Sequence, residues 1–480
     1  MELYDAVIVG SGFGGSIPAL RLAKSGRKVL VLEWGRRNTA KELKQKWGVR
    51  YYSTIYNAKA SSEGDVIFRY GRTLGGGSVV FSGACLRAPS GIFDFVDDLG
   101  YKVWPDEINR KVLDPFYDDV ENKMQISQIK WEEVPKPGAE FARMFFNIGK
   151  SCDRARFNYV DCIQCGFCEA GCIFDRKRSL LLNYIPEAEN NGAEFRTDCF
   201  VKYISKSSYG YKVVYSKFGA ENEVHSPLVV VAANAIESAA ILLRSKEFLP
   251  NLSDQVGKNF SNNGDLAWFF LLPKPVEGMH LYMGRNNAGT ISYAYCKPEY
   301  KYITMHAGCL PPGIFAALNI RRLSGEPSIP WGLKFKHFAK EVYMNRLIGV
   351  TGMGLVRGEG SITIDSLGNP IVNFPITPLF KNYIDDYYKV VKEIADGNNA
   401  EILAVSKNIF DIGGAHLLGS LRMAYTPEKG VCNPYGEVFG YRGLFVSDSS
   451  TIPGGTSVNP ALTIAANADR IAKYIVDNYG

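Results

Sequence analysis

An α/β fold is predicted for this chain, in which a parallel βαβ unit at the N-terminus is joined to a second region built on a mainly antiparallel β-sheet. The first observation is a glycine-rich turn at residues 10–15, placed between a short apolar run and a helical segment. The second is an apolar run at residues 228–231 that is again followed by a helical segment. The third is the alternating pattern between residue 266 and about residue 375, which is typical of short antiparallel strands.

The N-terminal unit has the order strand, glycine turn, helix, strand and acid. Gly10 permits the tight turn, Gly12 lets backbone amides approach a pyrophosphate, and Gly15 lets the helix pack closely against the strand. Glu33 ends the second strand and is placed to accept hydrogen bonds from ribose hydroxyls, so a 2′-phosphate is disfavoured. This motif does not show whether the bound dinucleotide is NAD or FAD. The predicted residues of this Rossmann-type dinucleotide site are Gly10, Gly12, Phe13, Gly14, Gly15 and Glu33.

A second glycine cluster lies at residues 71–78 and is predicted to contact a flat ligand. Its three adjacent glycines let the main chain lie against a ring with no side chain between them, and core packing does not require them. The apolar residues 79–81 that follow favour an ordered loop over a flexible one. The predicted cofactor-binding residues of this cluster are Gly71, Gly75, Gly76, Gly77 and Ser78.

Composition and charge indicate a globular protein and argue against a nucleic-acid-binding or membrane-spanning one. The chain of 480 residues is 46% hydrophobic and 22% charged, which is typical of a globular protein. Its net charge of +6 comes from scattered Lys and Arg side chains, so we expect no nucleic-acid partner. The sequence contains no run of about 18 apolar residues, so no transmembrane helix is predicted. A strand begins close to residue 1 and leaves no room for a signal peptide, so we expect a cytoplasmic protein.

One segment, residues 331–347, has an amphipathic pattern. Phe335, Phe338 and Val342 lie on one side of the expected helix, and lysines lie on the other. We expect a helix that covers the sheet with a solvated basic face. Docking on a membrane and a lid over the site are the alternatives.

Four of the ten cysteines are crowded into one short run with the spacing C-x2-C-x2-C-x3-C. This is the spacing of a bacterial ferredoxin run. No proline follows the fourth cysteine and no second run is present, so either Cys152 or Cys199 completes a cluster or three cysteines hold a three-iron cluster. An iron–sulfur cluster, a zinc site and a loop without metal all remain open. The candidate metal ligands are Cys162, Cys165, Cys168 and Cys172.

Two polar residues near the C-terminus are candidates for catalysis. His416 lies in a glycine-rich turn, and a histidine with a pKa near its ordinary value of about 6.5 suits a general base at neutral pH. Asn459 can hydrogen-bond a developing oxyanion through its amide. A histidine satisfied within the core or a loop is the alternative for His416. A helix N-cap before Pro460 is the alternative for Asn459.

With these motifs in place, the chain resembles the glucose–methanol–choline (GMC) family of flavin oxidoreductases, and within it the cholesterol-oxidase-like branch. The resemblance implies FAD, a discontinuous FAD-binding domain and a substrate domain on an antiparallel sheet. The FAD-binding domain is expected at residues 1–90, 190–265 and 425–480, and the substrate domain at 91–189 and 266–424. The matching stretches include residues 10–15, 75–78, 249–257, 260–265, 436–448, 452–453 and 458–460.

The resemblance also implies roles for single residues. His416 stands where the family keeps its active-site histidine, and Asn459, followed by Pro460, stands where it keeps the partner of that histidine. Asp448 is similar to the acid beside the flavin's ribityl and pyrophosphate, and Val201 falls where the family wraps the adenine. Cholesterol oxidases also use a substrate-domain carboxylate, for which no counterpart can be aligned in this chain.

The predicted function is that of an FAD-dependent alcohol oxidoreductase. A hydride passes from the carbinol C–H of a sugar, polyol or sterol-like secondary alcohol to flavin N5, with His416 as base. The expected electron acceptor is oxygen, a quinone or a redox protein, and a homo-oligomer is compatible with the sequence. The alternatives are a flavin-dependent reductase of C=C bonds, a non-catalytic flavin or iron–sulfur electron-transfer subunit, and a NAD-binding protein.

Overall fold

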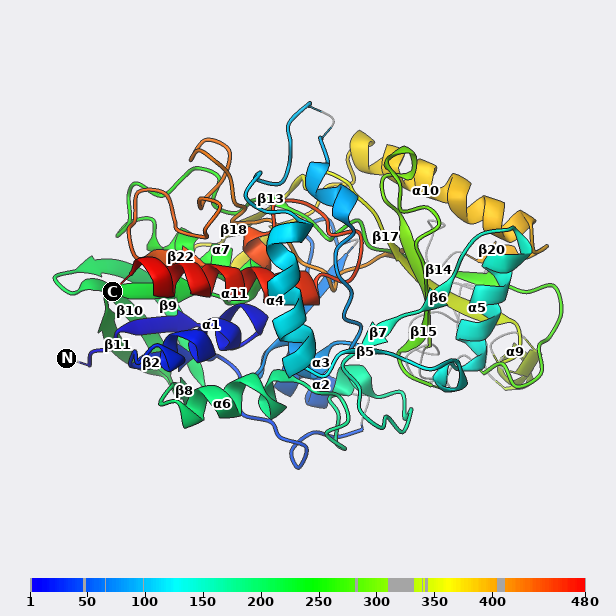
Figure 1. Ribbon diagram of the computed structural model, residues 1–480, viewed down its shortest axis with the longest axis horizontal. Helices are drawn as coiled ribbons and strands as arrows, with labels where there is room; N and C mark the ends of the chain where they lie inside the picture. The colour runs from blue at the N-terminus through cyan, green and yellow to red at the C-terminus, as the bar shows by residue number, and fades with distance from the viewer. Residues whose placement is uncertain are drawn as a thin grey trace.

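The computed structural model describes residues 2–45, 49–64, 66–97, 99–280, 284–309, 332–338, 340–341, 344–403 and 411–479. Figure 1 shows an elongated molecule made of two regions that lie side by side. Both described chain ends lie in the first region, which holds a parallel sheet. An antiparallel sheet forms the second region.

The parallel sheet has five strands and forms the core of the first region. All of its pairings are parallel. Every residue of β1, β2 and β12 is buried, which explains why these strands are continuous apolar runs in the sequence. The strand order is β22 (Leu444–Val446), β12 (Leu228–Val231), β1 (Ala6–Val9), β2 (Val29–Leu32) and β8 (Glu194–Arg196).

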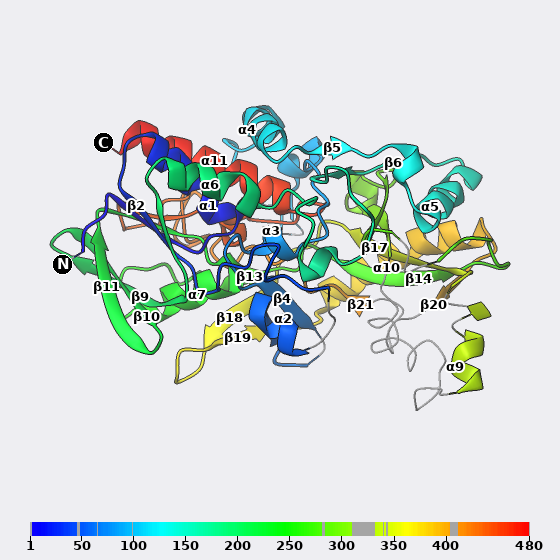
Figure 2. The same ribbon diagram turned by 90° about the horizontal axis from the view of Figure 1, so that it is seen from below.

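Helices and a small sheet cover the two faces of the parallel sheet. One face carries α1 (Phe13–Lys24), α6 (Tyr184–Asn190) and α11 (Ala461–Asn478), which pack against one another. On the opposite side lie α7 (Asn234–Ser245) and the antiparallel strands β9 (Cys199–Ser207), β10 (Gly210–Lys217) and β11 (Ala220–Ser226), as Figure 2 shows. This arrangement confirms the predicted α/β class.

An antiparallel sheet of seven strands forms the core of the second region. Helix α5 (Lys136–Asn147) packs on β15, β16 and β17, and α10 (Pro378–Asp396) contacts β20 (Figure 1). The prediction of a mainly antiparallel sheet is therefore confirmed. The strand order is β20 (Glu401–Leu403), β14 (Leu266–Leu271), β17 (Leu347–Met353), β16 (Thr304–Gly308), β15 (Asn287–Ser292) and β6 (Asp153–Arg154), with β21 (Asp411–Ile412) paired to β14.

Several further sheets and helices complete the described fold. A three-stranded sheet contains β13 (Lys258–Phe260), β18 (Gly360–Ile364) and β19 (Pro370–Asn373). Two two-stranded antiparallel sheets pair β3 (Tyr56–Ala60) with β4 (Ile67–Gly71), and β5 (Ser127–Gln128) with β7 (Arg156–Phe157). The remaining α-helices are α2 (Val49–Ile55), α3 (Gly77–Val80), α4 (Arg110–Lys123) and α9 (Leu333–Phe338).

Two sequence expectations relate to these elements. The strands of the parallel sheet fall within the ranges expected for the FAD-binding domain, but α4, from a range expected in the substrate domain, packs against α11. The domain boundaries themselves remain a prediction. Of the amphipathic stretch 331–347, only α9 and a few neighbouring residues are described, and the predicted apolar face with Phe335, Phe338 and Val342 lies outside the described side chains. Among the described helices, none has the length and apolar character needed to cross a membrane.

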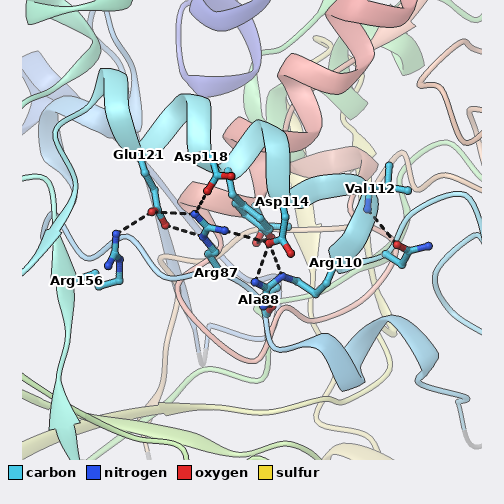
Figure 3. A network of polar contacts seen from close by, with 11 residues as sticks. Arg87, Ala88, Arg110, Val112, Asp114, Asp118, Glu121 and Arg156 are labelled. Atoms are coloured by element: carbon cyan, nitrogen blue, oxygen red, sulfur yellow. Dashed lines mark hydrogen bonds and ion pairs between the residues drawn. The ribbon is translucent and has the colours of Figure 1, made fainter.

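A network of ion pairs attaches α4 to the segments beside it, as Figure 3 shows. Arg87 donates from Nε to Glu121 Oε1 at 2.8 Å and from Nη2 to Oε2 at 3.0 Å. Arg156 on β7 donates to Glu121 Oε2 at 2.7 Å. The Glu121 side chain is only 10% exposed, whereas Asp118, which also pairs with Arg87, is 62% exposed. Glu121 on α4 therefore binds both the segment that carries Arg87 and strand β7, and water screens its charge less than that of Asp118.

We expect Glu121→Gln to lower the free energy of unfolding by about 2 kcal/mol or more, because two arginines lose a buried carboxylate. Asp118→Asn, the matched control, should change it by less than about 1 kcal/mol, because that pair is solvent-screened. Urea unfolding of both variants measures the difference. Equal destabilisation by the two substitutions would contradict the central place given to Glu121.

Candidate active site

A cavity of about 910 Å³ is lined by residues from both sheets. Val9 and Leu32, at the carboxyl ends of β1 and β2, line one part of it. Ala267, His306 and Thr351, on β14, β16 and β17, line another part. The carboxyl ends of parallel strands are where α/β folds bind nucleotides. The cavity therefore brings a nucleotide-type cradle and the face of a second sheet into one space.

The cradle depends on close backbone approach within the glycine turn. A Cβ atom on Gly15 would lie 1.9 Å from the Gly10 carbonyl oxygen, so no larger residue fits there. A Cβ on Gly12 would meet nothing within 4 Å, which leaves the cavity side of the turn open. Helix α1 begins at Phe13 with no side-chain cap and no acid in its first turn. Its first N–H groups and its dipole are thus available to a phosphate, and this part of the cavity fits FAD.

The second glycine cluster packs directly on the first. Gly76 has a φ of +51°, and a Cβ there would lie 2.9 Å from Gly12 Cα. Gly75 donates its N–H to Ser11 Oγ at 3.0 Å. Ser78 Oγ donates to the Gly75 carbonyl at 2.6 Å and so closes the turn. The loop has defined hydrogen bonds and contacts, as the sequence predicted.

Most of the predicted cofactor residues line the cavity, although the cofactor contacts themselves remain predictions. Gly15, Gly75 and Ser78 are not among the lining residues and shape the backbone behind it. The residues that line it are Gly10, Gly12, Phe13, Gly14, Glu33, Gly71, Gly76, Gly77, Val201, Asp448, Asn459 and Pro460.

Glu33 is held by its own turn. Its carboxylate accepts hydrogen bonds from Ser11 Oγ at 2.6 Å, from the Ser11 N–H at 3.1 Å and from the Gly35 N–H at 2.6 Å. Burial raises the pKa of this carboxyl group. A carboxylate offers about four acceptor positions, so about one is left for a ribose hydroxyl.

Both carboxylate oxygens of Asp448 accept hydrogen bonds from the protein. Its Oδ2 accepts from the Asn234 N–H at 2.7 Å and from Ser238 Oγ at 2.6 Å, and its Oδ1 accepts from the N–H and hydroxyl of Ser450. Burial raises the pKa of this carboxyl group as well. The side chain connects the end of β22 to the start of α7. Its effect on a ligand is therefore exerted through the main chain it positions.

His416 and Asn459 meet at the cavity. The Asn459 amide nitrogen lies 3.2 Å from His416 Nε2. Helix α11 has Pro460 as its cap residue and no side-chain capping bond, so the Asn459 amide is not used as an N-cap. With the amide donating to Nε2, the fitting neutral tautomer carries its proton on Nδ1. His416 Nε2 is thus unprotonated, and its one lone pair can take a proton from a ligand hydroxyl once that hydroxyl replaces the Asn459 amide at Nε2.

Asp265 is a site residue that the sequence did not reveal. Its Oδ2 lies 2.9 Å from His416 Nδ1. The two atoms are at ion-pair distance but are not aligned as a hydrogen bond, so the contact is electrostatic. Asp265 is 3% exposed and comes directly before β14. The sequence position of Asp265, between a polar turn and a buried strand, could have marked it as a candidate site residue, because an acid there lies at the end of the sheet.

His306 is a second histidine in the cavity wall. Its Nδ1 lies 2.9 Å from the Asn287 amide nitrogen. Burial lowers the pKa of the imidazole to about 4, and the positive charge that His416 would carry acts in the same direction, while Asp265 opposes it. His306 is therefore neutral at physiological pH.

Lys177 connects the cysteine run to the second glycine cluster. Its ammonium donates to the carbonyl oxygens of Val79 at 2.8 Å, Phe81 at 2.7 Å and Cys168 at 2.6 Å. Burial lowers the pKa of the amine to about 8. This contact could not be predicted from the sequence, because a single lysine forms no recognisable pattern. The cysteine run thus supports the loop over which a flavin ring is expected to lie.

The expected metal site is not formed in the part of the chain that the structure describes. No group of three or more His, Cys, Asp or Glu side chains there is arranged to hold a metal ion. Cys165 is exposed and Cys168 is buried, and partial desolvation of the Cys165 thiol and burial of the Cys168 thiol raise the pKa of both. The Cys168 sulfur instead accepts from the Tyr159 hydroxyl at 3.2 Å.

The iron–sulfur and zinc interpretations of the cysteine run gain no support from this arrangement and remain predictions. The spacing of a ferredoxin run is present, but no three of these side chains are grouped to hold a metal ion. Cys152 and Cys199, considered as completing ligands, are buried free thiols on other segments. The cysteines whose metal-binding role remains a prediction are Cys162, Cys165, Cys168 and Cys172.

Comparison with known proteins identifies related sequences along most of the chain. Two GMC oxidoreductase family models match residues 4–263 and 357–468. A cholesterol oxidase of Acinetobacter baumannii is 25% identical, with 98% of this chain and 94% of that protein covered. A long-chain-alcohol oxidase of Arabidopsis thaliana is 24% identical, with 98% and 68% covered.

Solved structures with the same fold include two oxidases. Pyridoxine 4-oxidase from Mesorbium loti has a TM-score of 0.71 at 15% identity and covers 99% of this chain and 100% of its own. A formate oxidase also has a TM-score of 0.71 at 15% identity, with 100% and 99% covered. At this identity the likeness shows the fold alone.

We expect Lys177→Met to lower the free energy of unfolding by about 2–4 kcal/mol and to reduce flavin retained after gel filtration, because three buried carbonyls lose a charged donor. Lys389→Met, on a side chain that is 75% exposed, is the matched control and should change little. Urea unfolding and flavin content per chain measure both effects. If Lys177→Met behaves like the control, Lys177 does not support the loop.

We expect His306 to make the protein less stable in acid. Between pH 6.5 and about 4 the unfolded chain binds a proton at this histidine that the folded chain does not bind. The free energy of unfolding therefore falls as the pH falls through this window, by up to about 3 kcal/mol. His306→Gln should remove that part of the slope in urea unfolding at pH 4.5 and 7.0. An unchanged slope would show that His306 is not buried as a neutral ring.

Proposed function

Because the chain belongs to the GMC oxidoreductase family, we propose that it is an FAD-dependent enzyme that oxidises an alcohol, with His416 as the base. The observation that carries this proposal is the meeting of His416, Asn459 and Asp265 at one cavity that also holds the glycine cradle. The names of the relatives, cholesterol oxidase and long-chain-alcohol oxidase, support an alcohol as the electron donor.

The two glycine clusters and Glu33 are the residues proposed to hold FAD. The open side of the Gly12 turn and the uncapped start of α1 suit the pyrophosphate, and Glu33 suits a ribose hydroxyl. Val201 lines the cavity where we propose the adenine end lies. FAD, when bound, supplies N5 as the acceptor of a hydride from the carbinol carbon.

The protein's own residues handle the proton. His416 Nε2 removes the hydroxyl proton from the alcohol, and the Asn459 amide nitrogen, 3.2 Å away, is placed to donate to the same oxygen as negative charge develops. The imidazole becomes positively charged in this step. Asp265, 2.9 Å from Nδ1, stabilises that charge and thereby assists proton removal.

Oxygen is the proposed electron acceptor, with hydrogen peroxide as the second product, because the relatives are named oxidases. A flavin-dependent C=C reductase or an electron-transfer subunit would not need a histidine, an amide and a carboxylate gathered at the cavity. Those alternatives therefore leave the arrangement of His416, Asn459 and Asp265 without a use.

We expect His416→Ala to lower the rate of alcohol-dependent flavin bleaching about 10²- to 10⁴-fold, because the reaction loses its base. Bound FAD per chain should stay the same. Anaerobic stopped-flow absorption with a panel of sugars, polyols, sterols and long-chain alcohols measures the rate. His225→Ala, a buried histidine on β11 that does not line the cavity, is the control. Bleaching by His416→Ala at the control's rate would remove the assigned role.

A further inference from the structure

One arginine in the cavity wall has no partner within the described part of the chain. The arginines that line the cavity there are Arg69, Arg72 and Arg244. Arg244 donates to three backbone carbonyl oxygens at 2.5–3.2 Å. Arg72 donates to the Ser53 carbonyl oxygen and lies over the Trp34 ring, 5.1 Å from its centroid. The Arg69 guanidinium forms neither a hydrogen bond nor an ion pair with the described residues, so its donors are free for a ligand.

Strand β4 brings Arg69 to the side of the cavity that holds His416. Arg69 donates its backbone N–H to the Gly414 carbonyl oxygen at 2.8 Å. A Cβ on Gly414 would lie 2.1 Å from the Ile67 carbonyl oxygen, so β4 packs tightly along the segment that leads to His416. Side chains alternate along a strand, and Ile67 and Arg69 are both exposed and both line the cavity. Arg69 therefore offers accessible surface in the same space as His416.

Two carboxylates act on Arg69 without pairing with it. Burial by itself lowers the pKa of the guanidinium, but Glu169 and, more weakly, Asp265 outweigh this and hold the pKa above its ordinary value. Both carboxylates line the cavity, and Asp265 Oδ2 lies against His416 Nδ1. Arg69 thus stays charged at any physiological pH, and its five N–H donors are not used by these carboxylates.

The chemistry of an unpaired guanidinium selects an anionic group on the ligand. A carboxylate or a phosphate accepts two parallel N–H···O bonds from its planar fork. An ammonium is repelled, and a neutral hydroxyl accepts a hydrogen bond without compensating the charge. Apolar side chains, among them Ile67, Phe269 and Val350, line the cavity as well. A carbon skeleton that ends in one anionic group therefore matches both kinds of wall.

We propose that the substrate is an alcohol that carries a carboxylate or a phosphate, and that Arg69 binds this anionic group while the hydroxyl is oxidised beside His416. This inference rests on the proposed function. The anionic group takes no part in the redox step and fixes the orientation of the substrate. Cholesterol and long-chain alcohols, which appear in the names of the relatives, carry no such group. Arg69 is then a specificity-determining residue.

The test uses the FAD-loaded full chain and ligands that differ in charge. Lactate, hydroxybutyrate, hydroxyhexanoate and hydroxymethylbenzoate are each compared with their neutral amides, and phosphate monoesters of diols of similar length distinguish phosphate from carboxylate. Binding is measured as the perturbation of the oxidised flavin spectrum in His416→Ala, so that no turnover occurs, and kcat/KM is measured with the unmodified enzyme. At least one anionic alcohol should exceed its neutral counterpart about tenfold or more in both measurements, which is the contribution of one charged hydrogen bond.

Variants of Arg69 test the role of the guanidinium. Arg69→Met should lower kcat/KM for the preferred anionic alcohol at least about tenfold more than for its amide, mainly through KM. Arg69→Lys keeps the charge without the fork and should recover part of the preference. Arg143→Met is the matched control, because the Arg143 side chain on α5 is 50% exposed and does not line the cavity. Should Arg69→Met fold poorly, Arg69→Gln makes the same comparison.

The outcomes separate this inference from the proposed function. Faster turnover and tighter binding of the amides than of the acids and phosphates would overturn the anionic substrate and keep the proposed alcohol oxidation. Equal losses for the anionic alcohol and its amide in the Arg69 variants would also overturn it. If no alcohol bleaches the flavin, the proposed function fails, and the binding titration with Arg69→Met then decides whether the cavity binds an anion through Arg69.

Discussion

The carboxylate of Asp448 is the interaction on which the arrangement of this site depends. Asp448 comes shortly after strand β22. Its carboxylate accepts four hydrogen bonds, two of which, from Asn234 and Ser238, hold the start of α7. A Cβ on Gly14 would lie 2.7 Å from the Asp448 Cα, so the same residue also presses on the glycine turn. Segments from the two ends and the middle of the chain therefore meet at one buried acid. The cradle, the strand that bears it and the helix beside it are positioned together.

Electrostatics divides the cavity into two functional parts. Around the cradle, N–H groups and the end of a helix dipole favour phosphate. Directly before β14, Asp265 Oδ2 lies 2.9 Å from His416 Nδ1. His306 stays neutral because burial disfavours its charged form and Asn287 occupies one ring nitrogen. Two histidines in one cavity thus have different surroundings, His416 beside a carboxylate and an amide and His306 buried against an amide.

Local patterns in the sequence predicted the parts of the protein that local physics determines. The glycine turn, its flanking strands and the alternation of the antiparallel region follow from periodicity and backbone freedom, and all three are present. The resemblance to a family located His416 and Asn459, and the structure brings them to 3.2 Å. Asp265 and Lys177 were not predicted as site residues, because His416, Val79 and Phe81, which they contact, lie far from them in the sequence. The spacing of the cysteine run does not settle whether it binds a metal, because spacing does not report burial and its thiols differ in burial.

The order of strands in the parallel sheet has a consequence for synthesis on the ribosome. Strand β1 pairs on one side with β2, which follows within the same unit, but on the other side with β12, where Ala6 faces Leu228. Strand β12 in turn pairs with β22, where Val229 faces Leu444. A nascent chain therefore exposes an apolar sheet edge until the last strand emerges. Such non-local pairing slows folding and leaves the growing chain dependent on protection from aggregation.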